Sequence, residues 1–358
     1  MASPAGENLS PIRKKRNRPA KSGDGGTADA AVDLTRLLDI AGAFPRQTIC
    51  VVGDFVLDEF VSSDISRVSR EAPVLILRQR RIEAYPGGAA NAVNNLADLG
   101  ARVLPVGAVG DDEGGHRLLE CFRRKRIDTS RIVRVKNWVT PTKTRFLAGW
   151  THTTEQQVLR VDKEPQGELP LRAQEAIARK ARSAAKRAGA VLVSDYGFGA
   201  VTPALVRGLR ARCITLDSRF RMLDYKNTGV TAATPNEPEL EAAYQTQVGT
   251  DTRKLVELGQ RALHDLGVEG LVVTRGKDGM AVFGRESTVV RHIPIYGSES
   301  PVDVTGAGDT VIAVFTLALA AGASLLEAAH LANYAGGIVV MKRRTSTVTR
   351  TELEAALR

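Results

Sequence analysis

The C-terminal half of the chain alternates between two hydrophobic patterns. Short apolar runs, typical of buried strands, lie at 191–194, 214–217, 230–233 and 271–274. Between them, apolar residues recur every three or four positions, which predicts helices near 173–187, 204–212, 237–244, 251–266 and 307–320. This alternation predicts an α/β fold, in which helices cover both faces of a mainly parallel sheet and ligands bind at the carboxyl ends of its strands.

The N-terminal half is richer in strands. Strands are predicted at 48–52, 56–62, 74–81, 103–106, 142–147 and 157–162, and helices at 33–43, 88–99 and 113–125. The strand-rich segments within about 58–82 and 142–162 predict a small sheet that forms a lid. Residues 1–30 are rich in Gly, Pro, Ala, Ser and charged residues, so we expect a disordered basic tail followed by one domain over residues 31–358.

Composition and charge limit the kinds of protein to which this chain can belong. No apolar run is long enough to cross a bilayer, and no signal-peptide core follows the basic start. Cys50, Cys121 and Cys213 are scattered, which favours reduced thiols and a cytoplasmic protein. The net charge of +10 suits nucleic acid, phosphorylated small substrates or a solvated surface. We expect no membrane partner and disfavour nucleic acid, because aromatic residues are few and no known motif is present.

The candidate chemistry is concentrated in the sequence Val-Asp-Val-Thr-Gly-Ala-Gly-Asp at 302–309. A small-residue turn opens here onto an apolar helix, whose first N–H groups and positive dipole end suit an anion. The amides of Gly306, Ala307 and Gly308 are the candidate anion site, and Asp309 is placed to take a proton from an attacking hydroxyl. The alternative is that Asp309 caps the helix and the two glycines simply make a tight turn.

A second small-residue segment gives these residues a context. Gly87-Gly88-Ala89-Ala90-Asn91 precedes the 302–309 segment, and the two together resemble the signatures of the ribokinase-like carbohydrate kinases, the PfkB family. The resemblance runs from about residue 49 to the C-terminus. It implies a three-layer α/β/α core with a β-sheet lid, ATP and Mg²⁺, a sugar hydroxyl as acceptor, Asp309 as the base, the amides of 306–309 as the anion hole, and a homodimer paired through the lid.

The resemblance also implies an acceptor site, with Asp58, Gly88 and Asn91 in contact with the sugar and Gly87 allowing close approach. Segments 66–74, 86–91, 142–145, 156–162 and 194–196 are similar to those of the heptose-7-phosphate kinases of lipopolysaccharide precursor synthesis. In that group they surround a phosphorylated sugar. The residues implied are Arg67, Lys143, Arg145, Arg160 and Asp195; arginine and lysine suit phosphate oxygens. The alternative is that they are ordinary surface charges.

The nucleotide end is implied by further matches to the family. Asn236 and Glu239 would organise Mg²⁺ through water, although the same spacing is that of a capping box. Thr274, Gly276 and Gly279 would line the nucleotide site, and Asn333 would lie beside the adenine; a hairpin loop and a buried helix amide are the alternatives. Asp303 and Thr305 are the candidates for a monovalent cation such as K⁺.

Three residues depart from the pattern of the resembling kinases. Phe198 stands where the heptose kinases carry lysine, Arg219 ends a segment that usually reads Asp-Pro-Lys, and arginine replaces glycine in 342–345, near the monovalent-cation loop. The first departure does not fix which sugar phosphate is the acceptor, and the third does not fix whether potassium activates the enzyme. The chain has no His-x-Gly-His sequence, so we expect no adenylyltransferase half. The alternatives are a related sugar kinase with another acceptor and a sugar- or nucleotide-binding pseudokinase.

Overall fold

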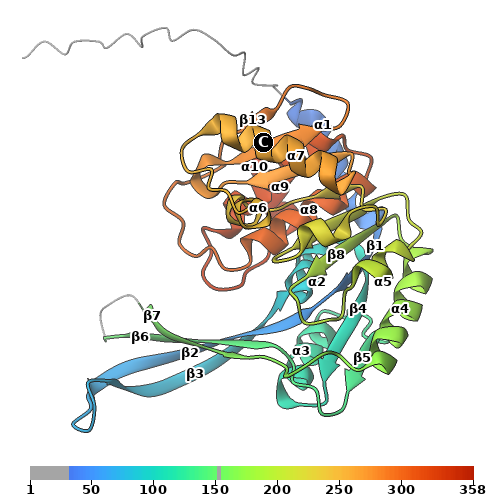
Figure 1. Ribbon diagram of the computed structural model, residues 1–358. Coiled ribbons are helices and arrows are strands. Elements are labelled where there is room, and N and C mark those ends of the chain that lie inside the picture. The colour runs from blue at the N-terminus through green and yellow to red at the C-terminus, as the bar shows by residue number, and fades with distance from the viewer. Residues whose placement is uncertain (1–31, 151–154) are drawn as a thin grey trace, which may run out of the picture.

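The computed structural model describes residues 32–150 and 155–358 (Figure 1). The predicted tail lies outside these ranges. The described chain forms a large sheet between two layers of helices, and a second, smaller sheet extends from one end of this core (Figure 1). The predicted three-layer α/β/α fold with a small additional sheet is therefore confirmed.

Nine strands form the large sheet of the described chain, in the order β13-β12-β11-β10-β9-β8-β1-β4-β5. All neighbours from β11 to β5 pair in parallel, whereas β12 and β13 are antiparallel. Strands β1 and β8 are interior neighbours in this sheet and are almost wholly buried, as expected where helices cover both faces. The strands are β1 (Thr48–Gly53), β4 (Arg102–Gly110), β5 (Ile132–Val135), β8 (Ala190–Asp195), β9 (Ile214–Ser218), β10 (Ala232–Ala233), β11 (Gly270–Thr274), β12 (Met280–Gly284) and β13 (Arg291–Ile293).

Helices pack on the two faces of this sheet as two apolar clusters. One cluster contains α1 (Leu34–Gly42), α2 (Ala89–Asp98), α3 (Glu113–Arg124), α8 (Ala307–Ala320), α9 (Leu325–Val339) and α10 (Arg350–Ala356). The other contains α4 (Leu171–Ala185), α5 (Pro203–Arg207), α6 (Glu237–Tyr244) and α7 (Thr252–Leu266). Helix α8 is apolar and buried along most of its length, so its N-terminus is held firmly. Within the described ranges, no helix is long and apolar enough to cross a membrane.

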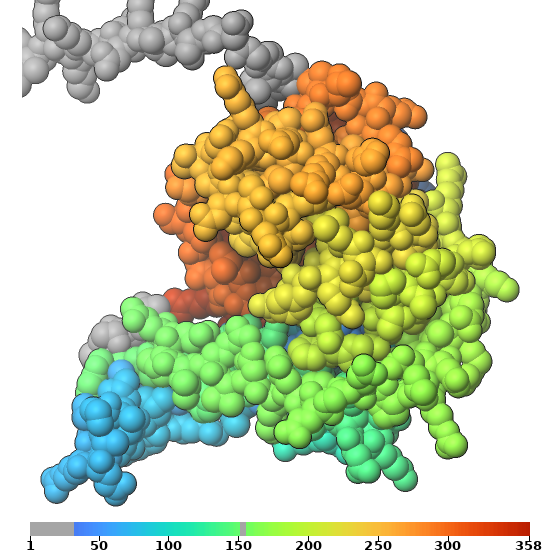
Figure 2. All heavy atoms as spheres, in the orientation of Figure 1, coloured from blue at the N-terminus to red at the C-terminus, as the bar shows by residue number. Residues whose placement is uncertain are grey.

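The small sheet has the order β3-β2-β6-β7, with β2 (Phe55–Val68), β3 (Leu75–Gly88), β6 (Thr142–Gly149) and β7 (Gln156–Lys163). Strand β2 pairs antiparallel with β3 and parallel with β6. Because β2 begins two residues after β1 ends, the small sheet is anchored directly to the core. The far end of the β2–β3 hairpin continues past β6 and projects away from the body (Figures 1 and 2).

Several elements differ from the sequence prediction. Strands β2 and β3 are each 14 residues long, since they pair with each other along almost their whole length. The helix predicted at 204–212 ends at Arg207, and the strand predicted at 230–233 is reduced to Ala232–Ala233. The predicted helix at 88–99 begins at Ala89, because Gly88 has a positive φ of 55° and belongs to β3. Strands β5, β12 and β13 were not predicted.

Candidate active site

The turn before α8 has a backbone that only glycine suits. Gly306 is the residue before the helix and has a φ of 80°. A Cβ atom at this position would collide with the side-chain nitrogen of Asn91. The Ala307 N–H donates to the carbonyl of Val304 at 3.2 Å, whereas among the described residues the N–H groups of Gly306, Gly308 and Asp309 meet no protein acceptor. Helix α8 therefore leaves the amides of Gly308 and Asp309 free for an anion, beside that of Gly306 in the turn.

Asp309 lies in the first turn of α8 and is 5% exposed. Its two carboxylate oxygens accept hydrogen bonds from different segments: Oδ1 from the Tyr196 hydroxyl at 2.7 Å and Oδ2 from the Asn91 amide at 3.1 Å. Burial raises the pKa of Asp309 to about 7, although both hydrogen bonds act in the opposite direction. A buried carboxylate with a pKa near neutrality is suited to general base chemistry.

Asn91 joins the two small-residue segments. It lies on α2, and its side-chain nitrogen also donates to the Gly306 carbonyl at 3.1 Å. Its side-chain oxygen accepts from Asn95 at 3.1 Å, which fixes the orientation of the amide. The segment around Gly87 and Asn91 is thus in direct contact with the turn before α8, 215 residues later in the chain.

Asp58 begins a row of charged residues on one face of the small sheet. Its carboxylate accepts from Arg145 at 2.7 Å and from the Thr345 hydroxyl at 2.9 Å, and it is buried. A Cβ at Gly87 would come within 2.5 Å of the Asp58 carboxylate, so glycine leaves room for it.

The cations of this face come from β6 and β7. Lys143 is paired with Asp58 across the strands, and Arg145 is paired with Arg160. Arg160 also binds Asp162. Burial lowers the pKa of Lys143. Four of the predicted substrate residues therefore share one face of the small sheet: Asp58, Lys143, Arg145 and Arg160. The Lys143 ammonium lies 5.1 Å from the centre of the Tyr196 ring, which shows that this face is turned toward the core.

Tyr196 was missed as a site residue. It follows β8, in the segment Ser194-Asp195-Tyr196 from which only Asp195 was selected. The turn after β8 is organised by Asp54, whose buried carboxylate accepts the N–H groups of Tyr196, Phe198 and Ala200 at 2.9 to 3.0 Å. Burial, and then the neighbouring Asp195, raise the pKa of Asp54 to about 6. The turn carries the Tyr196 hydroxyl to Asp309 while its ring faces the small sheet.

Two adjoining cavities lie at the N-terminus of α8. The first has a volume of about 260 Å³ and is lined by Asp309, Gly306, Asn236 and Glu239 among others. The second, of about 440 Å³, is mostly apolar and is lined by Gly276, Gly279, Asn333 and Ala307 among others. Gly308 and Thr274 line both. Every residue predicted for the nucleotide end therefore borders one of these two cavities.

Glu239 forms the capping box that its spacing allowed and also faces the first cavity. Its carboxylate accepts the Asn236 N–H at 2.9 Å, and the Asn236 side chain accepts the Glu239 N–H at 2.7 Å. Asp217, at the end of β9, lines the same cavity. Burial, followed by repulsion from Glu239, raises the pKa of Asp217 well above its usual value, and burial also raises that of Glu239. Two half-buried carboxylates that line one cavity fit a divalent cation.

Two predicted substrate residues are not brought to this site. Arg67 lies exposed near the tip of the β2–β3 hairpin, nine residues along the strand from Asp58, which corresponds to about 30 Å. Asp195 is buried and points elsewhere: its carboxylate accepts from Arg221 at 3.0 Å and from the Tyr225 hydroxyl at 2.7 Å. Asp195 therefore holds the loop after β9.

The predicted monovalent-cation residues support a loop joined to the small sheet. The two oxygens of Asp303 accept backbone N–H groups, one from Thr305 at 2.9 Å and one from Arg344 at 2.8 Å. Arg344, one of the two arginines in 342–345, has a φ of 66°. Its guanidinium binds Glu83 and donates to the Ser62 hydroxyl at 3.1 Å. The side chain of Arg344 thus links the C-terminal loop to β2 and β3.

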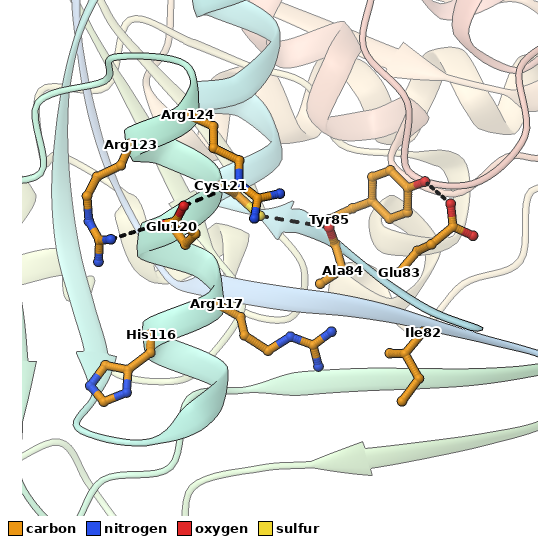
Figure 3. A pocket seen from close by; sticks show the side chains of 10 residues that line it. All are labelled: Ile82, Glu83, Ala84, Tyr85, His116, Arg117, Glu120, Cys121, Arg123 and Arg124. Carbon is orange, nitrogen blue, oxygen red and sulfur yellow. Dashed lines mark hydrogen bonds and ion pairs between the residues drawn. The ribbon is translucent and has the colours of Figure 1, made fainter. Parts of the chain in front are cut away.

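A larger hollow of about 690 Å³ lies between β3 and α3, away from these cavities (Figure 3). No residue predicted for the site lines it. Its arginines are engaged by carboxylates: Arg117 binds Glu59, and Arg123 and Arg124 bind Glu120 (Figure 3).

Residues 46–352 match the pfkB family of carbohydrate kinases. The chain belongs to this family. It is 40% identical over 312 residues to the bifunctional protein HldE of Geobacter sulfurreducens and 38% identical over 321 residues to that of Mesorhizobium japonicum. These matches cover 86% and 88% of this chain, but the chain spans only 62% of each relative's length.

Solved structures agree with the fold. A ribokinase from Arabidopsis thaliana, complexed with ribose and ATP, aligns with a TM-score of 0.64 at 19% identity, over 87% of this chain and 99% of that one. Phosphofructokinase-2 from Escherichia coli, in complex with potassium, aligns with a TM-score of 0.68 at 16% identity, over 87% and 98%. The chain thus belongs to a family of carbohydrate kinases, and the two segments that resemble the signatures of that family meet at Asp309.

Proposed function

We propose that this carbohydrate kinase transfers the γ-phosphoryl group of ATP to the anomeric hydroxyl of a heptose 7-phosphate. The observation that carries the proposal is the position of Asp309. This buried carboxylate lies at a helix N-terminus, between a sheet face that carries Lys143, Arg145 and Arg160 and an apolar cavity of nucleotide size. The segments that resemble those of the heptose-7-phosphate kinases favour a heptose phosphate among sugar acceptors.

In this proposal the small sheet binds the acceptor. Asp58 and the backbone beside Gly87 and Gly88 hold sugar hydroxyls, and Asn91 orients the base. Arg145 and Arg160, adjacent on β6 and β7, bind the phosphate of the sugar, because guanidinium groups form paired hydrogen bonds with phosphate oxygens.

The cavities beside α8 bind ATP. Gly276, Gly279 and Asn333 border the apolar cavity, which suits the adenine, and Thr274 stands where this cavity meets the polar one. Glu239 and Asp217 would hold Mg²⁺, partly through water, and the ion would neutralise phosphate charge. The amides of Gly308 and Asp309 then face the transferring group.

The reaction follows from these positions. Asp309 accepts the proton of the anomeric hydroxyl as its oxygen forms a bond to the γ-phosphorus. The bond from phosphorus to the β,γ-bridging oxygen breaks, and ADP leaves with that electron pair. Charge on the transferring oxygens is stabilised by the two free amides and the dipole of α8.

An acceptor panel tests this function. Heptose 7-phosphate, its unphosphorylated heptose and shorter sugar phosphates are each incubated with MgATP, and ADP formation is measured. We expect the highest kcat/KM for the heptose 7-phosphate. A preference for an unphosphorylated sugar would identify a related kinase with another acceptor, and tight binding of sugar and ATP without ADP formation would identify a pseudokinase.

The pKa of Asp309 predicts the pH dependence of turnover. The base must be ionised to accept a proton, and its pKa is raised to about 7. We therefore expect kcat to fall about tenfold per pH unit below pH 7 and to level off above it. A profile of kcat at saturating substrates from pH 5 to 9 measures this, and a flat profile down to pH 5 would contradict it.

The phosphate-binding role of Arg145 predicts a selective effect on substrate binding. Arg145→Ala removes a cation beside Asp58 and should raise the KM for the sugar phosphate about tenfold or more, with the KM for ATP within about twofold of the parent. Arg67→Ala is the control variant with which Arg145→Ala is compared. Because Arg67 lies far from Asp58 in its own chain, it should leave the sugar-phosphate KM unchanged unless a second subunit supplies it.

We infer that this second subunit exists. The face of the small sheet opposite Asp58 exposes Ile82, Leu159 and Val161, and Val68 and Leu75 are exposed at the hairpin end. Apolar residues gathered on one face of a sheet fit a homodimer paired through the lid. Light scattering at micromolar concentration should give a dimer. A monomer would overturn this inference. In that case Arg67→Ala should leave the KM for the sugar phosphate unchanged.

A further inference from the structure

Tyr196 lies between the small sheet and Asp309. Its hydroxyl donates to Asp309 Oδ1 at 2.7 Å, and its ring lies 5.1 Å from the Lys143 ammonium on β6. The backbone of Tyr196 is fixed in turn by the Asp54 carboxylate at 2.9 Å. The hydroxyl, the ring and the backbone of Tyr196 each make one of these contacts. Together the contacts fix the position of the residue and the direction of its hydroxyl.

We propose that Tyr196 is a positioning residue for the base, which holds the Asp309 carboxylate in one orientation and favours its ionised form. This inference rests on the proposed function. The carboxylate has two hydrogen-bond donors, Asn91 on Oδ2 and Tyr196 on Oδ1. With both hydrogen bonds present, the plane of the Asp309 carboxylate is held against rotation. In the proposed complex this directs a carboxylate lone pair at the acceptor hydroxyl of the sugar.

Tyr196 remains a donor over the whole working range of pH. Burial, and then the charge of Asp309, raise the pKa of the Tyr196 phenol well above 10. Charged groups that face Asp309 from other elements are Asp58 on β2, Lys143 on β6 and Asp217 on β9. The two carboxylates favour the protonated form of Asp309 and Lys143 opposes it, so hydrogen bonds to the ionised form are needed to keep the base active near neutral pH.

Tyr196→Phe tests the proposal, because it keeps the ring beneath Lys143 and removes the hydroxyl. We expect the acid limb of the kcat profile to move up by about one to two pH units, the worth of a hydrogen bond to a charged group. Because the parent base is half ionised at pH 7, kcat at that pH should fall about 5- to 50-fold and recover largely at pH 9. The KM values for sugar and ATP should remain within about twofold of the parent.

Tyr244→Phe is the matched control. It removes another Tyr–Asp hydrogen bond, from Tyr244 to Asp265 at 3.0 Å, on α6 and α7 away from the cavities. Its pH profile should equal the parent's. If Tyr196→Phe lowers the melting temperature but keeps the parental acid limb, Tyr196 is only structural and the proposal is overturned.

A measurement without turnover separates this inference from the proposed function. Carbon-13 NMR of the side-chain carboxyls, with Asp309→Asn to assign the signal, follows the titration of Asp309 directly. The Asp309 pKa should be higher in Tyr196→Phe than in the parent, and equal values would overturn the proposal. If no sugar is phosphorylated by the parent, the proposed function fails, while the titration still decides whether Tyr196 favours the ionised form.

Discussion

Asp309→Asn should lower kcat by a factor of about 10²–10⁴, with the dissociation constants for sugar and nucleotide close to those of the parent. The substitution keeps the shape of the side chain and one oxygen that accepts a hydrogen bond. It removes the group that takes the proton. A sugar hydroxyl is a poor nucleophile until its proton is transferred, so the loss should appear in kcat. Turnover under saturating substrates and both dissociation constants, measured by calorimetry, are the readouts.

Asp251→Asn provides the matched control for this experiment. Asp251 precedes α7 and accepts the Arg253 N–H at 2.9 Å, so it caps a helix outside the cavities. Asparagine caps a helix as well as aspartate does. If Asp309 were only a cap, both variants should behave like the parent, and near-parental turnover of Asp309→Asn would remove it from the mechanism.

Gly306→Ala should lower kcat about a hundredfold or more, the usual effect of losing anion-stabilising amides. Gly306 has a positive φ, and a Cβ added there would lie 2.4 Å from the side-chain nitrogen of Asn91. A methyl group forces Asn91 away from the Asp309 carboxylate and shifts the amides that follow. The variant should therefore lose both the orientation of the base and the geometry of the anion turn. Turnover and binding of a non-hydrolysable ATP analogue measure this.

Gly322→Ala separates activity from backbone strain. Gly322 follows the other end of α8, has a φ of 90°, and has open space around the position of a Cβ. Both variants put alanine in a left-handed conformation and should lose about 1 kcal/mol or more in free energy of unfolding. Only Gly306→Ala should lose turnover. An equal loss in the two variants would show that strain, and not the anion turn, sets the effect.

The core of the fold was predictable because its signals are local. The apolar runs at 191–194, 214–217 and 271–274 are buried parallel strands, and the small-residue segment at 305–308 does open onto a buried helix. The length of β2 follows from its hairpin with β3, and its parallel pairing with β6 joins residues 85 positions apart, such as Asp58 and Lys143; periodicity encodes neither. Strand β13 is three residues long and contains one apolar residue, so its pattern gave no signal. Strand β12 is an apolar run as long as β11, and its pattern carried a signal that the prediction did not use.

The candidate site was predictable in its parts but not in its contacts. Sequence indicated Asp309 and Asn91 separately, and the structure joins them by a hydrogen bond across 218 residues. Asp195 and Tyr196 are neighbours at a strand end, where successive side chains point to opposite sides. The predicted site residue, Asp195, points into the protein, whereas the hydroxyl of its neighbour Tyr196 contacts Asp309. The position of Arg67 followed from the unexpected length of β2.

The two ends of the described chain share one part of the core. Helix α1 contacts α10, and Leu37 and Ile40 belong to the same apolar cluster as Leu353. During synthesis α1 has no cover from α10 until residues 350–356 have been made. Synthesis of α10 is therefore the step that closes this region. Nascent chains arrested before Arg350 should be cleaved within α1 by added protease and be bound by chaperones, whereas released chains that include α10 should resist both.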